Sequence, residues 1–284
     1  MRVQIDCYPC ILSQLSELAK RASADEGERH RIVRRLLRLV LEAPEDTTPP
    51  EFAGCFHRII HELTGEEDPF RHLKDQATGL GLALLPELRE LAASRRDPFE
   101  AAVRLAIGGN IIDYGVNPNF RLEDAEAGIR EVFDLPFDSA MAVELHRRME
   151  KAHSIVYMLD NCGEAVIDRM LVEPYADKIT VGVRGRPIFN DVTRREAAMS
   201  GYDFVPVIDT GEGVPGISLR GSSPEFLEKL RSADLIVTKG QGNYESLDEF
   251  TDCPVIFLLR IKCPVVSARL SGPLGALRIE GKNL

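Results

Sequence analysis

Polar residues that can bind a metal ion or a phosphate group stand directly after three predicted strands. Asp160 and Asn161 follow the apolar run 155–159, Asp191 lies in the segment after the run 179–183, and Lys239 follows the run 235–238. In an open parallel sheet, ligands bind beyond the carboxyl ends of the strands, so we expect these side chains at one edge. Carboxylate and amide oxygens suit Mg²⁺ or Mn²⁺ and leave positions for water and substrate.

A bound cation explains why several carboxylates would gather there. Carboxylates that converge without a cation repel one another, and the run 209–213 brings a third acidic segment to the same edge. We therefore predict a divalent-metal site built from Asp160, Asn161 and Asp191, with Mg²⁺, Mn²⁺, Co²⁺ or Ni²⁺ as candidates. The alternative is that the two Asp residues only cap the helices that follow them.

Lys239 opens a glycine-rich segment, Lys-Gly-Gln-Gly-Asn-Tyr-Glu. Glycine lets backbone N–H groups approach an anion, and the ammonium group adds a point charge, so we predict a phosphate cradle here. The segment is not a Walker A loop, and no Gly-x-Gly-x-x-Gly follows the first strand. A glycine-rich turn with a solvated lysine is the alternative.

Two glycines, Gly108 and Gly109, interrupt a good helix pattern just before Asn110. Glycine inside a helix costs roughly 1 kcal/mol relative to alanine, so a packing or functional reason is expected. Close approach of this helix to the sheet edge would present Asn110 to the cleft. Packing between helices is the alternative.

Six cysteines are present, and Cys7 and Cys10 form a Cys-x-x-Cys pair at a predicted helix start. A thioredoxin-like role is not favoured, because the pair lacks a βαβ context. Cys55 and His57 could complete a structural zinc site, but buried free thiols are the expected state. The six His residues are scattered and none follows a strand, so the sequence does not support histidine catalysis.

The elements that must position these residues fall into two halves. Residues 1–153 show helical spacing and predict six or seven helices, which can form two lobes, whereas residues 154–284 alternate short apolar runs with helical patterns. The fold class is therefore α/β, with a helical half packed on a doubly wound, mostly parallel, Rossmann-like sheet. The predicted strands are 155–159, 179–183, 204–208, 235–238, 255–259 and an edge strand 276–279, with helices starting near Cys162, Val192, Pro224 and Tyr244.

Composition excludes several classes of function. The chain has 284 residues and a formal charge of −10, which repels nucleic-acid phosphates and anionic lipids. No uncharged apolar run approaches the roughly 18 residues that span a bilayer, and the first residues do not form a signal peptide. We therefore expect a cytoplasmic protein without nucleic-acid or membrane partners. The oligomeric state leaves no readable trace.

Taken together, these segments resemble a known family, the metal-dependent damage-control phosphatases, first described as a domain of unknown function and also linked to an acidic-residue methyltransferase name. The resemblance runs nearly end to end and rests on five motifs in order. They are Asp6 to Cys10, Gly109 to Asp113, Leu159 to Glu164, Asn190 to Thr193, and Lys239 to Glu245. The paired cysteines look like the prokaryotic, stand-alone branch. Cys162 stands where the family usually has alanine.

The resemblance implies an α/β phosphatase that hydrolyses phosphate esters of small metabolites, including sugar phosphates and side products or damaged cofactor intermediates. It implies that Asp160, Asn161 and Asp191 bind the metal, that Lys239 binds phosphate, and that Asn110 contributes from the helical side. Glu164, Gly240 and Asn243 join the predicted substrate-binding set. The nucleophile stays open between water and an Asp carboxylate. The absence of an Asp-x-Asp motif after the first strand argues against a haloacid-dehalogenase site.

Two other functions remain as alternatives. A non-enzymatic sensor of phosphorylated metabolites would need nearly the same residues as a phosphatase. A carboxyl methyltransferase using S-adenosylmethionine would need a nucleoside loop, for which Gly211-Glu212-Gly213 is the candidate. That loop follows the third strand, whereas such a loop is expected after the first, where Asp160 and Asn161 stand.

Overall fold

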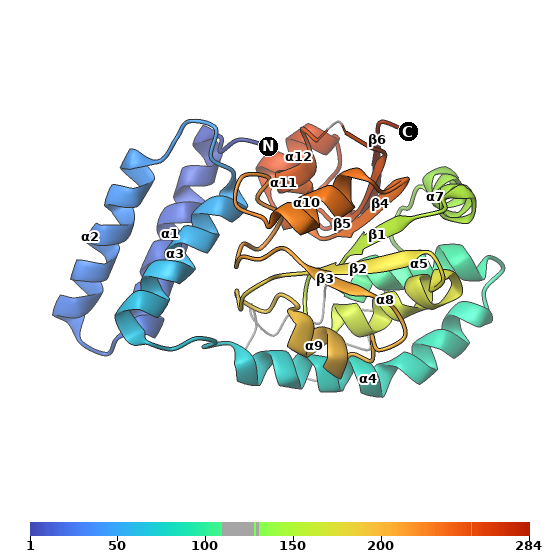
Figure 1. Ribbon diagram of the computed structural model, residues 1–284, viewed down its shortest axis with the longest axis horizontal. Coiled ribbons are helices and arrows are strands. Elements are labelled where there is room, and N and C mark those ends of the chain that lie inside the picture. The colour runs from blue at the N-terminus through green and yellow to red at the C-terminus, as the bar shows by residue number, and fades with distance from the viewer. Residues whose placement is uncertain (110–127, 129–130, 251) are drawn as a thin grey trace.

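The computed structural model describes residues 1–109, 128, 131–250 and 252–284, and its centre is one six-stranded sheet (Figure 1). The strand order is β3-β2-β1-β4-β5-β6. All neighbours pair in parallel except β5 and β6, which are antiparallel. The strands are β1 (Ile155–Met158), β2 (Ile179–Val183), β3 (Val207–Asp209), β4 (Leu235–Lys239), β5 (Val255–Arg260) and β6 (Leu277–Lys282).

Eleven α-helices are formed by the described residues. Those before the sheet are α1 (Tyr8–Ala22), α2 (Glu26–Glu42), α3 (Pro49–Thr64), α4 (Arg71–Ala93), α5 (Pro98–Gly108) and α7 (Ser139–Lys151). Those between the strands are α8 (Glu164–Val172), α9 (Arg194–Met199), α10 (Pro224–Arg231), α11 (Gln241–Leu247) and α12 (Pro264–Leu270).

Capping residues explain where several helices begin. Asp97 and Ser223 each accept a hydrogen bond from the third backbone N–H of the helix that follows, and a proline occupies the first helical position in both. Thr48 and Glu51 form a reciprocal capping box at α3. These signals lie in the local sequence, which is why the predicted breaks and the observed helix starts agree at these sites.

Both faces of the sheet are covered, as the doubly wound prediction required. Alternate strand residues such as Tyr157 and Val237 pack in one core with α4, α5, α7 and α8. Their neighbours Val156 and Ile236 pack in a second core with α10, α11 and α12. Burial on both faces is why these strands read as continuous apolar runs.

Helices α1, α2 and α3 form a separate lobe at one end of the molecule, with its own apolar core (Figure 1). The helical half therefore contains two groups, since α4, α5 and α7 share a core with the sheet rather than with this lobe. That shared core crosses the predicted boundary at residue 153. Among the described residues, no helix is long and apolar enough to cross a membrane.

The predicted strand limits needed correction at the sheet edges. We expected a strand over 204–208, but β3 spans Val207–Asp209 because Pro206 has no N–H and contributes only its carbonyl, which accepts a 2.9 Å hydrogen bond from Val181. The last strand was expected over 276–279 and runs to Lys282. Helix α9 begins at Arg194, not Val192, because Asp191 and Val192 are held in backbone pairing.

Candidate active site

Two loops meet beyond the carboxyl ends of β1 and β2 and pair through their backbones. The N–H of Cys162 donates to the carbonyl of Asn190 over 2.8 Å, and the N–H of Val192 donates to the carbonyl of Asp160 over 2.9 Å. Asn161 and Asp191 thus form an isolated antiparallel bridge. Backbone pairing fixes the separation of the predicted ligands even though they stand far apart in sequence.

Arg184 lies between the two carboxylates. Its guanidinium group is fully buried and donates to Asp191 Oδ2 over 2.7 Å and to Asp160 Oδ1 over 3.2 Å. A third hydrogen bond, of 3.0 Å, goes to Asn243 Oδ1. The planar fork of arginine suits this use, because it can satisfy several acceptors at once. Arg184 was not among the predicted site residues.

Asp160 is 8% exposed and Asp191 is 3% exposed. Burial raises the pKa of the Asp160 carboxyl well above its ordinary value, and the nearby Asp191 and Glu164 raise it further. Arg184 and Lys262 act in the opposite direction. The site therefore holds more carboxylate than the adjacent cations balance.

The Asn161 side chain lies in the same buried cluster. Its amide nitrogen donates to Asp160 Oδ2 over 3.2 Å and lies 3.4 Å from Glu164 Oε2. The structure thus brings Asp160, Asn161, Asp191 and Glu164 together, as the sequence predicted. The helix that begins at Glu164 follows Gly163, whose φ of 82° turns the chain out of the loop.

Gly240 and Asn243 close this site from the side of β4. Gly240 has a φ of 80°, and a Cβ atom at this position would lie 1.8 Å from Asp160 Oδ2. Asn243 is fully buried and donates to the carbonyls of Lys239 and Leu159 over 2.8 and 3.3 Å. Strands β1 and β4 are neighbours, so the site lies where the order of the sheet reverses.

Lys239 does not line an open phosphate cradle in this structure. Its ammonium group is fully buried and donates to Glu164 Oε1 over 2.5 Å, to Asp168 Oδ1 over 2.7 Å and to the Ala106 carbonyl over 2.8 Å. These three acceptors use all of its donors. The two carboxylates hold the pKa of Lys239 above its ordinary value although burial acts to lower it. The ion pair holds Glu164 beside Asn161.

The glycine pair before Asn110 has a packing reason. A Cβ atom at Gly108 would lie 2.2 Å from Val132, and one at Gly109 would lie 2.9 Å from Ile167 on α8. Close contact of α5 with α8 brings the end of α5 to the start of the site. Asn110 lies outside the described residues.

Oxygen ligands dominate the part of the site that could hold a metal. Four buried carboxylates, from Asp160, Asp191, Glu164 and Asp168, face two buried cations, Arg184 and Lys239. No three His, Cys, Asp or Glu side chains in the described part of the chain converge closely enough to hold a metal ion by themselves. The residues fit a divalent cation held by two carboxylates, an amide oxygen and further oxygens from water or substrate, which would also balance the carboxylate excess.

Lys262 is a second basic residue near the site that was not predicted from the sequence. It is exposed, follows β5 next to β4, and lies close enough to lower the pKa of Asp160. The backbone N–H of Lys262 donates a 2.9 Å hydrogen bond to Oε1 of Gln241, the first residue of α11. The available signal was a lysine three residues after the predicted strand 255–259.

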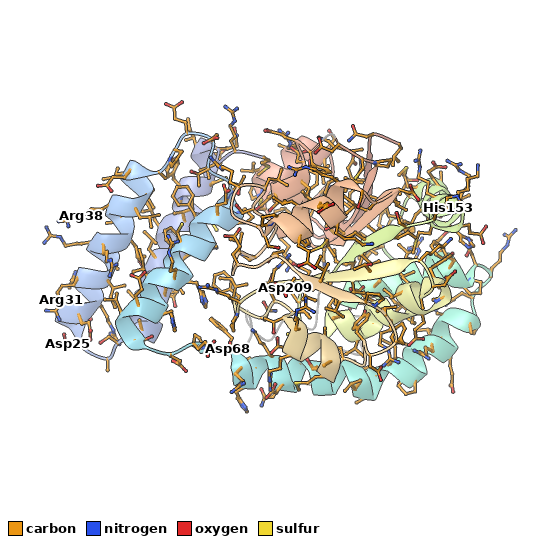
Figure 2. All side chains as sticks on the ribbon, viewed as in Figure 1. Asp25, Arg31, Arg38, Asp68, His153 and Asp209 are labelled. Carbon is orange, nitrogen blue, oxygen red and sulfur yellow. The ribbon has the colours of Figure 1, made fainter. Side chains whose placement is uncertain are left out.

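The third acidic segment expected at this edge lies apart from the centre. Asp209 ends the outer strand β3 (Figure 2) and pairs with Arg194. Gly211 and Glu212 pack tightly on Gly185, where an added Cβ atom would lie 2.4 Å from Gly211.

The alternative of a zinc site is wrong for the described residues. Cys7 and Cys10 lie at the start of α1, whereas Cys55 and His57 lie on α3, where His57 packs against aromatic rings. All six cysteines are free. The expected burial is wrong for this pair, because Cys10 is exposed and Cys7 is half-buried.

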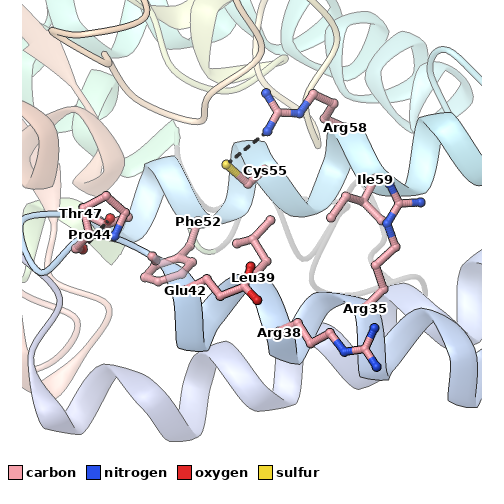
Figure 3. A pocket seen from close by; sticks show the side chains of 11 residues that line it. Arg35, Arg38, Leu39, Glu42, Pro44, Thr47, Phe52, Cys55, Arg58 and Ile59 are labelled. Atoms are coloured by element: carbon pink, nitrogen blue, oxygen red, sulfur yellow. Dashed lines mark hydrogen bonds between the residues drawn. The ribbon is translucent and has the colours of Figure 1, made fainter.

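A cavity of about 480 Å³ lies between α2 and α3 (Figure 3). Three arginines, Arg35, Arg38 and Arg58, contribute to its wall. None of the predicted site residues lines it, so the site at the sheet edge and this cavity are separate features.

The fold and the site together define a class of protein. It is a doubly wound α/β protein with a buried acidic site where the strand order of its sheet reverses. Residues 3–277 match the family model of the damage-control phosphatase ARMT1-like domain, and the chain belongs to this family. The family resemblance inferred from the five sequence motifs is thereby confirmed.

Individual relatives cover nearly the whole chain. The damage-control phosphatase PH1575 of Pyrococcus horikoshii is 31% identical over 283 residues, which are 98% of this chain and 97% of that protein. A damage-control phosphatase of Archaeoglobus fulgidus is 30% identical, covering 97% of each chain. The crystal structure of PH1575, described as a DUF89 family protein, superposes with a TM-score of 0.86, covering 98% of both chains.

Proposed function

We propose that this protein is a divalent-metal-dependent phosphatase that hydrolyses phosphate esters of small metabolites, such as sugar phosphates and damaged or side-product phosphometabolites. The single observation that carries this proposal is the pairing of the Asp160 and Asp191 loops, which holds two carboxylates and the Asn161 amide together beside Arg184. The names of the two archaeal phosphatases support the same reaction class.

Asp160, Asn161 and Asp191 would hold the cation, with Mg²⁺, Mn²⁺, Co²⁺ or Ni²⁺ as candidates. When bound, the cation would supply positive charge for the phosphoryl oxygens in the transition state. Arg184 fixes the orientation of both carboxylates, and Gly240 leaves the space that Asp160 occupies. Lys262, exposed near Asp160, offers a charge to an anionic substrate group.

Lys239 and Glu164 enter this proposal through their ion pair. Because the Lys239 ammonium group is buried among three acceptors, we assign it the role of holding Glu164 and Asp168, and we leave phosphate contact to accessible groups. Glu164 then lies beside Asn161 and faces the metal ligands. Asn243 supports Arg184 from β4.

The test is phosphate release from p-nitrophenyl phosphate and a panel of sugar and cofactor phosphates by chelator-stripped protein, before and after addition of each cation. We expect activity that requires the cation, and its loss in Asp160→Asn and Asp191→Asn. Asp177→Asn changes an exposed aspartate just before β2, at the end of the strand away from the site; it is the matched control and should retain activity. Full activity in either site variant would refute the assignment.

Two further outcomes are informative. Binding of cation and sugar phosphate without phosphate release would identify a metabolite sensor instead. In an active enzyme, acid quenching with a ³²P-labelled substrate separates the two nucleophiles, because an aspartyl-phosphate retains label on the protein whereas direct attack by water does not.

A further inference from the structure

Phe189 stands two residues before Asp191 in a tight turn. The N–H of Asp191 donates to the carbonyl of Ile188 over 3.0 Å, which closes the turn, and Phe189 has a φ of 41°. A bulky residue rarely adopts a positive φ, and such conformations persist only where surrounding contacts enforce them. The contacts of the Phe189 side chain are therefore the feature to explain.

The Phe189 ring packs between two aromatic rings, one on α3 and one just before α4. Its centroid lies 4.8 Å from that of His57 on α3, with the planes at 78°, and 5.8 Å from that of Phe70, at 71°. His57 and Phe70 are themselves 5.6 Å apart. Edge-to-face rings at these separations attract one another. Phe189 also packs against the core of the α1–α3 lobe.

His57 behaves as an aromatic surface in this cluster. It is 7% exposed, and its Nε2 atom has no hydrogen-bond partner among the described residues. Burial, together with the nearby Lys74 and His61, lowers the pKa of His57 to about 4. The ring is therefore neutral at physiological pH, and packing accounts for its contact with Phe189.

Phe189 thus connects the helical lobe to the proposed metal site. The carbonyl of the next residue, Asn190, accepts the hydrogen bond from the Cys162 N–H. The Asp191 carboxylate accepts a hydrogen bond from Arg184. We infer that Phe189 is a positioning residue, whose ring, held by His57 and Phe70, keeps the Ile188–Asp191 turn in the conformation that aims Asp191 at the site. This inference rests on the proposed function, in which Asp191 is a metal ligand.

The test compares Mn²⁺ affinity, measured by equilibrium dialysis, in the full chain and four variants. Phe189→Gly removes the ring but tolerates the positive φ, so the turn remains sterically allowed. We expect it to raise the Kd for Mn²⁺ by about 10-fold or more and to lower kcat in parallel, as loss of support for a metal ligand does elsewhere. Phe189→Tyr keeps the ring and should stay within about twofold of the parent.

Ile60→Ala is the matched structural control. Ile60 lies on α3, is buried in the same lobe core and is one helical turn from His57. It should lower the thermal midpoint, followed by circular dichroism, without changing the Kd for Mn²⁺. If Ile60→Ala weakens Mn²⁺ binding as much as Phe189→Gly at equal loss of stability, Phe189 has only a structural role and the inference is wrong.

Asp191→Asn separates failure of this inference from failure of the proposed function. If Asp191→Asn abolishes Mn²⁺ binding while Phe189→Gly binds like the parent, the proposed function stands and the positioning role is refuted. If Asp191→Asn itself binds Mn²⁺ normally, Asp191 is not a ligand, and both proposals fall.

Discussion

Arg184 donates a 2.7 Å hydrogen bond to Asp191 from a position that solvent does not reach. The same guanidinium group reaches Asp160, so one side chain neutralises part of both carboxylates. A buried charge without its partner is costly, and this ion pair is therefore a sensitive point of the structure.

Replacing Arg184 by Gln should lower the free energy of unfolding by about 3–5 kcal/mol in the presence of a chelator, because it leaves two carboxylates uncompensated. A divalent cation that binds the native state should return part of this loss, and so stabilise the variant more than the parent. Urea unfolding with chelator and with Mn²⁺ measures both effects. The control is Arg186→Gln, an exposed neighbour. Equal stability of the two variants would contradict the expectation.

Replacing Lys239 distinguishes two possible roles for this residue, a buried ion pair and a contact with substrate. If the ammonium group holds Glu164 and Asp168, Lys239→Met should destabilise the protein by about 3–5 kcal/mol, and adding Asp168→Asn should return part of the loss. A residue that only contacts phosphate would raise KM and leave stability unchanged. Denaturant unfolding and steady-state kinetics on the same preparations distinguish the two.

Gly240→Ala should remove activity and weaken metal binding. The new methyl group would lie 1.8 Å from Asp160 Oδ2, and φ at this position is 80°, so the carboxylate or the backbone must move. The backbone alone should cost roughly 1–2 kcal/mol. Gly79→Ala is the control, because a Cβ atom there meets no other atom within 4 Å. It should stabilise α4 by roughly 1 kcal/mol and leave kinetics unchanged.

The raised pKa of Glu245 leads us to expect that the free energy of unfolding depends on pH. Burial raises its pKa from 4.5 to about 7, so the folded state holds a proton that the unfolded state releases at lower pH. The stabilisation is complete below pH 4.5 and is lost as pH rises towards 7, by up to about 3 kcal/mol.

Glu245→Gln should remove this decrease and be more stable than the parent at pH 8. Urea unfolding from pH 5 to pH 8 measures the difference between the two proteins. The difference is the relevant quantity, since Asp168 also titrates near pH 7 in both. Parallel stability curves would show that Glu245 titrates as an ordinary carboxyl group.

Residues next to strands were the part of the site that sequence could predict. Asp160, Asn161 and Asp191 follow apolar runs, and the parallel topology brings such positions together whatever the side-chain detail. Arg184 was missed although it directly follows β2, because an arginine in a Gly- and Pro-rich segment is ordinary on a surface. Only the pairing of its loop with Val192 turns it inward.

The role of Lys239 could not be predicted from its neighbours in sequence. Its acceptors include Asp168, which lies one helical turn after Glu164 on α8, and the Ala106 carbonyl at the end of α5. Contacts between α5, α8 and β4 depend on how three elements pack, and glycine spacing near the lysine carries no information about them. The fold class, in contrast, follows from periodicity along the chain and was confirmed.

The paired loops at residues 160–162 and 190–192 have one more consequence. Their register is set by main-chain hydrogen bonds, so the backbone spacing of Asp160 and Asp191 does not depend on the number of residues between them. The segment 173–178 between α8 and β2 lies at the opposite end of the sheet, so it can change in length without breaking these hydrogen bonds. Variation in that segment can therefore accumulate while the backbone spacing of the two aspartates stays the same.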